Sequence, residues 1–181
     1  MQAANSTPPQ VKIAIIGAGF GGLAMAIRLL QNNIRDFVIL EKASEIGGTW
    51  RENQYPGAAC DVQSHLYSLS FSPKTDWSKR YAEAPEIYQY MQTLTAEHQL
   101  QPYIRFNTEV SAAHYLDNQC LWQLTLNQNE TLTAQFVIFA SGPLHVPQIP
   151  RIAGIEKFKG KVFHSSQWDH NYDLSNKNVA S

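Results

Sequence analysis

A short glycine-rich stretch, Gly17-Ala18-Gly19-Phe20-Gly21-Gly22, lies between a continuous apolar run and a segment with helical periodicity, and it constrains the first part of the fold. The residues before it, Val11–Ile16, form a continuous apolar run, which is typical of a strand buried on both faces. After it, apolar residues recur at helical spacing and predict a helix over 21–33. Phe37–Leu40 is a second apolar run. The sequence therefore predicts a strand–helix–strand unit, whose crossover should be right-handed.

Glycine is needed in such a loop because the turn is tight, the backbone must come close to a pyrophosphate, and the helix must pack against the strand. The N–H groups at the start of the helix then face the phosphates. Glu41 ends the second strand about 20 residues further on, where a carboxylate can accept hydrogen bonds from ribose hydroxyls. The alternative is an ordinary glycine turn with a solvated Glu41. The first part of the predicted dinucleotide site comprises Gly17, Gly19, Phe20, Gly21, Gly22, Glu41 and Lys42.

The rest of the chain continues an α/β pattern. Residues 43–63 contain glycine and proline but little periodicity, which indicates an ordered loop over a ligand. Residues 85–99 place apolar side chains on one side and predict a helix. Residues 103–140 alternate in polarity from Ile104 onward and predict a small antiparallel sheet, before Phe136–Ala140 returns to the parallel sheet. We therefore expect an α/β, Rossmann-like domain with a parallel sheet and a small antiparallel insertion.

The composition limits the classes of partner that the chain is expected to bind. The formal net charge is -1, which offers no basic footprint for nucleic acid or an anionic membrane. Only Cys60 and Cys120 are present, which fits a reducing cytosol. The N-terminal residues lack the apolar core of a signal peptide, no apolar stretch reaches the length of a membrane span, and the histidines show no metal-ligand spacing. We expect a cytoplasmic protein without a metal site, whose partners are small molecules and not nucleic acid or a membrane.

A second glycine segment, Glu45-Ile46-Gly47-Gly48-Thr49-Trp50, distinguishes among the dinucleotides. It resembles the glycine pair that passes the flavin side of FAD in FAD-binding oxygenases and disulfide reductases. Disulfide reductases carry two cysteines in the next segment, whereas this chain has only Cys60 there, which excludes dithiol chemistry. The resemblance implies FAD as the cofactor, with Gly48, Thr49 and Trp50 beside it. Trp50 is alternatively a core aromatic residue.

A third signature lies near the end of the chain. Its fixed positions fit the pattern F-x-G-x-x-x-H-x-x-x-W-D and are Phe158, Gly160, His164, Trp168 and Asp169. This pattern resembles the fingerprint of the Baeyer–Villiger monooxygenases, and the resemblance runs in unbroken order from Val11 to about Val179. It implies a flavoenzyme that uses NADPH and O2 to convert ketones into esters or lactones through a peroxyflavin. Related N-hydroxylating flavin monooxygenases generally have tyrosine at the Trp168 position.

The same resemblance assigns roles to individual residues. Residues 55–61, Tyr-Pro-Gly-Ala-Ala-Cys-Asp, are similar to the Y-P-G-x-x-x-D segment of that family. This implies that Asp61 lies near the nicotinamide and positions a catalytic arginine that lies beyond this chain. Alternatively, Asp61 caps a helix over about 64–69. Tyr67 is expected either to reach the cofactor or to belong to the core. The remaining predicted cofactor-binding residues are Val110, Ser141 and Gly142.

His164 has two interpretations. In the family this histidine lies at the junction between two nucleotide-binding domains and couples their motion. The alternative is that His164 acts directly as a general acid or base.

The expected organisation is a flexible leader over 1–10, a FAD-binding domain over 11–142, a linker with the fingerprint over 143–176, and the first strand of a truncated NADPH-binding domain over 177–181. We thus expect the N-terminal part of a flavoprotein with two dinucleotide-binding domains. It should bind NADPH mainly through residues that it lacks and be inactive alone.

Three other functions compete with a ketone monooxygenase. A flavin monooxygenase that oxidises nitrogen or sulfur is disfavoured by Trp168 and Asp169. An ordinary NAD(P) Rossmann module is disfavoured by residues 47–50. A non-catalytic FAD-binding fragment is the third, because a second phosphate-binding loop does not occur in the sequence. The sequence identifies neither the ketone nor the oligomeric state.

Overall fold

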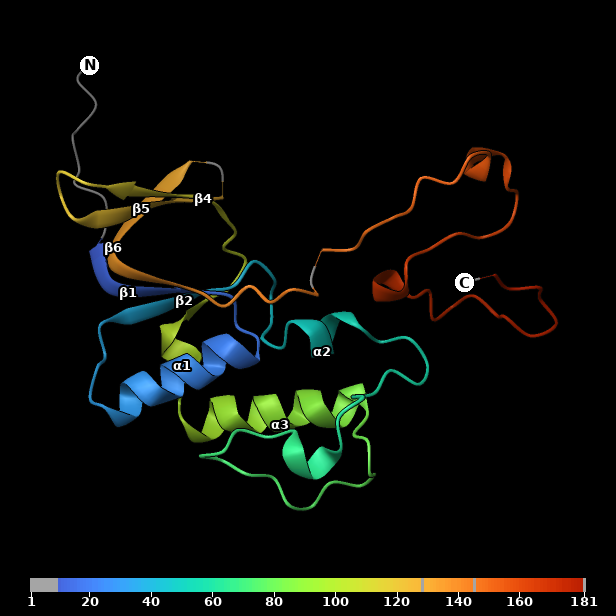
Figure 1. Cartoon of the computed structure of the whole chain (residues 1–181), viewed down its shortest axis with the longest axis horizontal. Coiled ribbons are helices and arrows are strands. Elements are labelled where there is room, and N and C mark those ends of the chain that lie inside the picture. Colours follow the sequence, from blue (N-terminus) through green and yellow to red (C-terminus); the bar gives the residue numbers. More distant parts are fainter. Residues whose placement is uncertain (1–9, 128, 145, 181) are drawn as a thin grey trace.

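The computed structural model describes residues 10–127, 129–144 and 146–180. Its strands form one six-stranded sheet in the order β3-β2-β1-β6-β5-β4 (Figure 1). The strands are β1 (Gln10–Ile16), β2 (Phe37–Leu40), β3 (Ile104–Arg105), β4 (Val110–Leu116), β5 (Leu121–Leu126) and β6 (Glu130–Phe139). The helices are α1 (Phe20–Gln31), α2 (Thr49–Glu52) and α3 (Ala84–Glu97), with 3-10 turns at Ser64–Leu66, Gln101–Tyr103, Ile155–Lys157 and Ser165–Gln167. No helix in the described part of the chain is long and apolar enough to cross a membrane.

The predicted strand–helix–strand unit is confirmed. Strands β1 and β2 pair in parallel, with Ile15 opposite Ile39, and α1 connects them. Leu23 and Ile27 of α1 are fully buried, and burial of each side chain contributes on the order of 2 kcal/mol. The helix ends at Gln31, earlier than predicted, because the chain turns at Asn33, whose φ of 60° is left-handed. The helix predicted over 85–99 is α3.

A single long strand, β6, joins the parallel and antiparallel parts of the sheet. Its residues 130–134 pair antiparallel with β5, and its residues 133–139 pair in parallel with β1. The antiparallel strands therefore extend the parallel sheet. The sequence prediction is wrong for Ile104, which lies in β3 at the opposite edge and pairs in parallel with Ile39. Alternation indicates a half-buried strand, but it does not identify the neighbouring strand.

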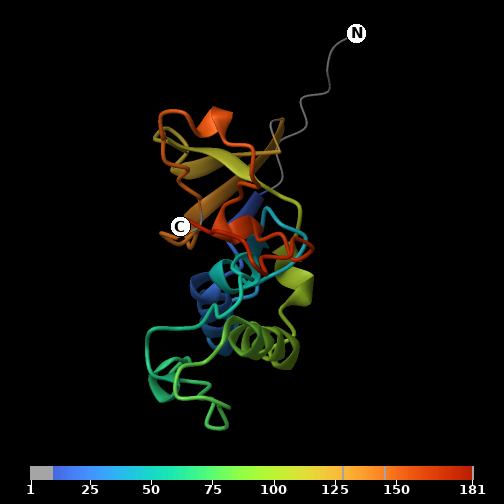
Figure 2. The same ribbon diagram turned by 90° about the vertical axis from the view of Figure 1, so that its right-hand side faces the viewer.

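The sheet separates two hydrophobic cores. On one face, α1 and α3 pack against Ile13, Ile15 and Ile39. Over the other face, the β4–β5 hairpin and the start of β6 curl back, and Figure 2 shows these layers in profile, with the outer strands above and the helices below. The second core comprises Ala14, Val38, Leu40, Leu124, Leu126, Leu132 and Ala134. Coverage of both faces explains why β1 and β2 have continuous apolar sequences.

Three segments differ from the sequence prediction. The helix predicted over 64–69 is one 3-10 turn, because this segment runs beside residues 80–82, where the Ser64 N–H donates to the Arg80 carbonyl at 2.8 Å. Gln10, predicted to be in the leader, is the first residue of β1, and residues 1–9 lie outside the described part. Residues 177–180 form no strand, although a strand was predicted to start there, and Ser181 lies outside the described residues.

Candidate functional site

A pocket of about 800 Å³ opens at the carboxyl ends of β1, β2 and β6, with Ile16, Leu40 and Ala140 in its lining. Ligands bind at this edge of parallel α/β sheets, and the volume is typical of sites that enclose small molecules. The pocket is also lined by all but one of the predicted cofactor-binding residues, namely Gly17, Gly19, Phe20, Gly21, Glu41, Lys42, Gly48, Thr49, Trp50, Asp61, Tyr67, Val110, Ser141 and Gly142.

The glycines of the first loop have three different tasks. Gly17 has a φ of 101°, and a Cβ atom there would lie 2.7 Å from the Ala140 carbonyl oxygen. A Cβ on Gly22 would lie 1.9 Å from the Gly17 carbonyl oxygen, so Gly22 permits helix–loop packing and does not line the pocket. Gly19 has an ordinary φ of -80°, and its Cβ would meet only the Gly48 Cα, at 4.0 Å. Gly19 therefore keeps space open in the pocket itself.

The start of α1 presents uncapped N–H groups to this pocket. Gly19 is the N-cap, and no described side chain caps the helix. Its first turn contains no acidic residue, so no side chain of that turn neutralises the partial positive charge of the helix end. This arrangement favours an anionic group such as a phosphate.

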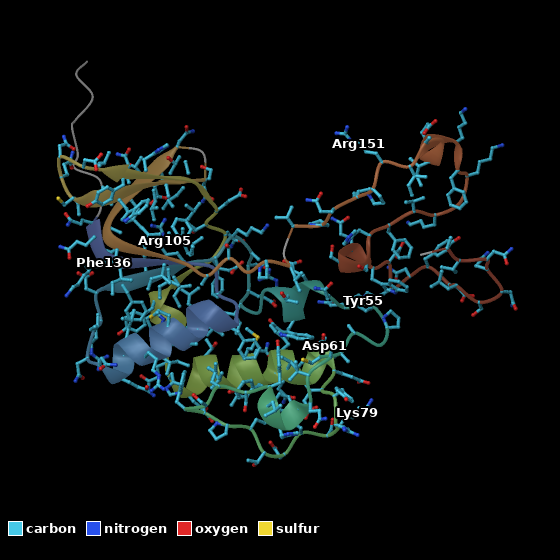
Figure 3. All side chains as sticks on the ribbon, in the orientation of Figure 1. Tyr55, Asp61, Lys79, Arg105, Phe136 and Arg151 are labelled. Atoms are coloured by element: carbon cyan, nitrogen blue, oxygen red, sulfur yellow. The ribbon has the colours of Figure 1, made fainter. Side chains whose placement is uncertain are left out.

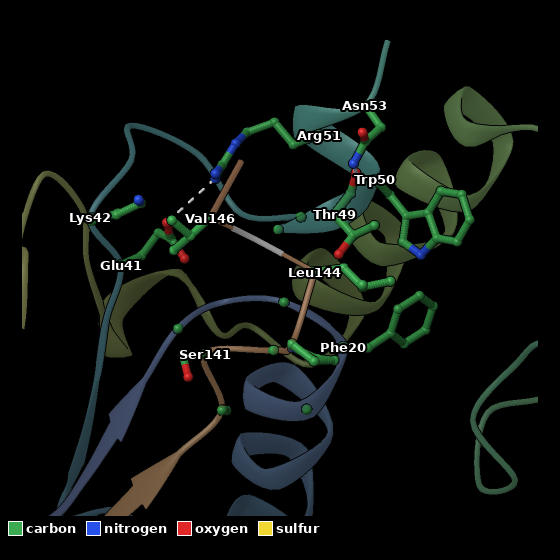
Figure 4. Close-up of a pocket in the computed structure, with 18 of the residues that line it drawn as sticks. Phe20, Glu41, Lys42, Thr49, Trp50, Arg51, Asn53, Ser141, Leu144 and Val146 are labelled. Atoms are coloured by element: carbon green, nitrogen blue, oxygen red, sulfur yellow. Dashed lines mark hydrogen bonds and ion pairs between the residues drawn. The ribbon is translucent and has the colours of Figure 1, made fainter. Parts of the chain in front are cut away.

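Glu41 braces the glycine loop from the end of β2. Its carboxylate is buried, with 5% of the residue exposed. Oε2 accepts the Ala18 N–H at 2.8 Å, and Oε1 accepts the Ala43 N–H at 3.0 Å. The Arg51 guanidinium lies 3.5 Å from Oε1, and Figure 4 shows this pair at one end of the pocket. The alternative interpretation required a solvated Glu41. The burial of this carboxylate contradicts that interpretation.

The second glycine segment contacts the first directly. The Gly47 N–H donates to the Ala18 carbonyl at 3.0 Å, and a Cβ on Gly48 would lie 3.4 Å from the Gly19 Cα. A Cβ on Gly47 would lie 2.6 Å from the Tyr88 ring. The two glycine loops therefore lie in contact, and together they form a backbone-lined middle section of the pocket.

The other end of the pocket is aromatic. Phe20 and Trp50 lie there, away from Glu41 and Lys42 (Figure 4). Tyr67 packs edge-on against both rings, with centroid distances of 5.5 Å to Phe20 and 5.6 Å to Trp50. The Trp50 indole N–H donates to the Tyr67 hydroxyl oxygen at 3.0 Å. Trp50 also packs against the core, as the alternative interpretation expects, and its place beside FAD stays a prediction. Burial raises the pKa of Tyr67 above its usual value of 10.0, which keeps its hydroxyl protonated.

Asp61 lies in the pocket lining and is exposed. Figure 3 shows Tyr55 and Asp61 on the segment after α2, on the side turned toward the C-terminal segment. The alternative role as a helix cap is wrong, because Gln63 precedes the 3-10 turn and no side chain caps it. Among the described residues, Asp61 has no ion-pair partner. Its carboxylate is therefore available to a group at the pocket mouth.

Sequence reasoning missed several residues of the pocket. The side chain of Arg51 points back to Glu41 from α2, a helix of four residues that is too short to show periodicity. Pro143, Leu144 and Val146 follow Gly142 and line the pocket, although the sequence assigned them to the linker. The unpredicted lining residues include Arg51, Asn53, Tyr55, Cys60, Thr108, Glu109, Pro143, Leu144 and Val146.

The fingerprint residues lie apart from the pocket lining. The His164 Nδ1 accepts the Ser166 N–H at 3.1 Å and so caps a 3-10 turn. Around it, the Lys161 ammonium lies 2.8 Å from the Asp169 carboxylate. The Phe163 and Trp168 rings meet edge to face at 5.1 Å. These contacts give the motif a local structural task, and the coupling role of His164 stays a prediction.

Comparison with known proteins gives a consistent result. A family profile described as pyridine nucleotide-disulphide oxidoreductase matches residues 14–180. A Baeyer-Villiger monooxygenase of Streptomyces coelicolor is 46% identical over 170 residues, which are 94% of this chain and 33% of that protein. The chain thus spans about a third of the length of such relatives.

Solved structures show the same similarity. Cyclohexanone monooxygenase from Rhodococcus sp. Phi1 bound to NADP+ superposes with a TM-score of 0.83 at 35% identity, covering 93% of this chain and 32% of the other. OTEMO in complex with FAD and NADP gives a TM-score of 0.81 at 36% identity, covering 91% of this chain and 31% of the other. The fold described above therefore matches one part of larger proteins.

Proposed function

The chain belongs to the pyridine nucleotide-disulphide oxidoreductase family and is a homologue of the N-terminal, FAD-binding portion of Baeyer–Villiger monooxygenases, and we propose that its pocket binds FAD in a protein that uses NADPH and O2 to oxygenate ketones.

The order of features along the pocket carries this proposal. A buried carboxylate at Glu41 suits ribose hydroxyls, the uncapped N–H groups after Gly19 suit a pyrophosphate, and the aromatic end suits a flavin ring. FAD carries ribose, pyrophosphate and flavin in this same order. The cradle at Gly19 and Gly48, which a Cβ would partly fill, also fits a ligand in close backbone contact.

The side chains of this chain bind and orient, whereas bound FAD would supply the redox chemistry. Glu41 would hold the ribose and at the same time fix the loop that faces the phosphates. Phe20, Trp50 and Tyr67 would form the wall beside the flavin and exclude water from it. Asp61 would keep a negative charge at the pocket mouth, where it can pair with an arginine or orient a nicotinamide supplied from outside these residues.

For the 181 residues alone, we propose FAD binding without turnover. The relatives are about three times as long, and most of their length has no counterpart in this chain. We propose that NADPH and the ketone bind mainly through such further residues. Added NADPH and ketone should therefore not be consumed by the purified chain with FAD, and ketone-dependent turnover would contradict this division of labour.

A single substitution tests the FAD site. Gly19→Ala is sterically acceptable in the protein, because φ is -80° and the nearest contact is ordinary. The added methyl group would nevertheless occupy the space of a close pyrophosphate. We expect FAD binding, followed by flavin fluorescence, to weaken by at least about tenfold with unchanged thermal unfolding.

The control is Gly154→Ala, which lies outside the pocket and has open space around its Cβ; its left-handed φ of 85° strains alanine there, so this variant tests a local loss of stability without loss of space in the pocket. This variant should bind FAD like the wild type. A wild-type chain that binds NADP and no flavin, or a Gly19→Ala chain that binds FAD unchanged, would overturn the proposal.

A further inference from the structure

A second hollow lies between α3 and the segment that follows β2. Its lining comes from residues 44–46, from α3 over residues 88–96, and from residues 99–106, and we call it the α3 hollow. Its volume is about 530 Å³, which falls within the range of small-molecule sites. Within the described part of the chain, it shares no lining residue with the pocket proposed for FAD. The α3 hollow is therefore a separate candidate site.

The α3 hollow combines an apolar interior with a neutral polar rim. Ile46 and Thr95 are buried, and the Thr95 hydroxyl donates to the Met91 carbonyl at 2.9 Å, so its hydrogen is already used. Phe106 adds a half-buried ring that packs against the core. The exposed rim carries the amide side chains of Gln92, Gln99 and Gln101. Such a lining suits a ligand with an apolar body.

Of the described residues that line the α3 hollow, only Glu45 is charged. The Tyr88 hydroxyl donates to its Oε2 at 2.7 Å, which fixes the carboxylate in place. Glu45 has no ion-pair partner within residues 10–127, 129–144 and 146–180. Arg51 donates to the Glu45 backbone carbonyl, but its charge is paired with Glu41 and Glu52. The Glu45 carboxylate is therefore available to a cation.

The carboxyl end of α3 adds to this negative potential. Thr95 and Ala96 of its last turn line the hollow, and so does Gln99 just beyond. All residues of α3 are described, and its last turn contains Glu97 but no basic residue. No side chain of that turn compensates the partial negative charge of the helix end. The helix end and Glu45 thus favour the same sign of ligand charge.

From the volume, the apolar interior and the single unpaired carboxylate, we infer that the α3 hollow binds a small organic ammonium ion. The ammonium group pairs with Glu45, and the apolar body of the ligand packs against Ile46 and Phe106. The rings of Tyr88 and Phe106 add attraction for a cation that lies over their faces. Tyr88 is a positioning residue as well, because its hydroxyl orients the carboxylate. This inference does not depend on FAD binding.

The experiment uses phenethylamine, which is an ammonium ion at neutral pH, and follows backbone amide NMR signals of the complete chain at low salt. We expect saturable shifts in residues 44–46, 88–96 and 99–106, with a dissociation constant on the order of 1 mM. Phenethyl alcohol has the same ring without the charge, and it should bind about fivefold more weakly, as expected for one exposed ion pair. Added salt should weaken the binding of the amine only.

Three variants test the residues. Glu45→Gln keeps the shape of the side chain and should weaken phenethylamine binding about fivefold. Tyr88→Phe keeps the ring but frees the carboxylate, and should weaken it about twofold. Glu97→Gln is the matched control, because it removes a negative charge from the end of the same helix outside the lining, and should bind the amine like the wild type. Glu45 and Glu97 are exposed, so the unfolding temperatures of their variants should not change.

Three results would overturn the inference. Phenethyl alcohol could bind as tightly as the amine, or Glu45→Gln could bind the amine unchanged. Equal losses in Glu45→Gln and Glu97→Gln would show a general electrostatic effect without a site. Shifts confined to the pocket proposed for FAD would place the amine elsewhere. A chain that binds the amine at the α3 hollow but binds no FAD would contradict only the proposed function.

Discussion

The Glu41 carboxylate accepts the backbone N–H of Ala18 at 2.8 Å, which ties the end of β2 to the middle of the glycine loop. Glu41 thus belongs to the protein's own structure before any ligand binds. Its two oxygens each accept a backbone N–H, so the geometry of the loop depends on a carboxylate at this position.

Glu41→Gln should destabilise the chain without any ligand. An amide has one acceptor oxygen and directs its NH2 group at a second N–H, which leaves buried donors unpaired. We expect a loss of about 2 kcal/mol and a fall of roughly 4–8 °C in the midpoint of thermal unfolding. The control is Glu130→Gln, whose carboxylate pairs with Arg105 on the exposed surface and whose loss should cost less than about 1 kcal/mol. Equal effects of the two variants would contradict the bracing role.

Gly22→Ala should prevent folding. Its Cβ would lie 1.9 Å from the Gly17 carbonyl oxygen, a backbone atom that cannot give way alone. Gly21→Ala is the matched control, because its Cβ would meet the Ala140 side chain at an ordinary 3.6 Å. Circular dichroism and soluble yield should separate the two variants, and a well-folded Gly22→Ala chain would show that α1 can shift away from the loop.

The ion pair of the fingerprint loop predicts a defined pH window. Hydrogen bonding to Lys161 lowers the pKa of Asp169 below its usual 3.8. The contribution of the Asp169 carboxylate to stability is therefore present above pH 3.8 and is lost as the pH falls through the lowered pKa. The hydrogen bond to Asp169 raises the pKa of Lys161 above 10.5. The contribution of the Lys161 ammonium group to stability is therefore present below pH 10.5 and is lost as the pH rises through the raised pKa. Lys161→Met should move the Asp169 titration, followed by NMR, up toward the ordinary value.

Asp173 provides the internal control for that titration. The Ser175 backbone N–H lowers its pKa, and Lys161 does not contribute. Its titration should therefore be identical in Lys161→Met and the wild type. An Asp169 titration that does not move would mean that the ion pair is absent in solution.

Asp61→Asn is expected to separate cofactor binding from catalysis in the full-length protein. This prediction is a hypothesis that rests on the exposed carboxylate at the pocket mouth. FAD should stay bound, while reduction by NADPH should slow by about 10²-fold or more, as when a preorganised charge is removed. Stopped-flow reduction traces that match the wild type would exclude the role, and Asp76→Asn, exposed outside the pocket, is the control.

The sequence predicted those features that depend on neighbouring residues. The glycine loop, α1 and the apolar strands follow from local patterns, and the structure confirms them. Gly17 and Gly48, which were predicted to bind the cofactor, line the pocket, and the left-handed φ of each position favours glycine there.

Features that depend on distant contacts were not predicted. Ile104 was assigned to the wrong part of the sheet, because two residues of alternating polarity do not reveal their partner strand. The ion pair between Arg51 and Glu41 joins separate segments across the pocket and leaves no periodic signal. Gly22 was predicted to bind the cofactor but does not line the pocket, and its distance to Gly17 shows that its task is the close packing of α1 on the loop.

The pairing of β1 with β6 has a consequence for how the protein is made. The floor of the pocket joins Ile16, near the start of the chain, to Phe139, and the Ala140 N–H closes the ladder on the Ile16 carbonyl at 2.9 Å. During synthesis, β1, α1 and β2 leave the ribosome long before β6 does, and such a distant pairing forms late. Until then the glycine loop lacks one of its walls, so the pocket can form in a nascent chain only after β6 has emerged.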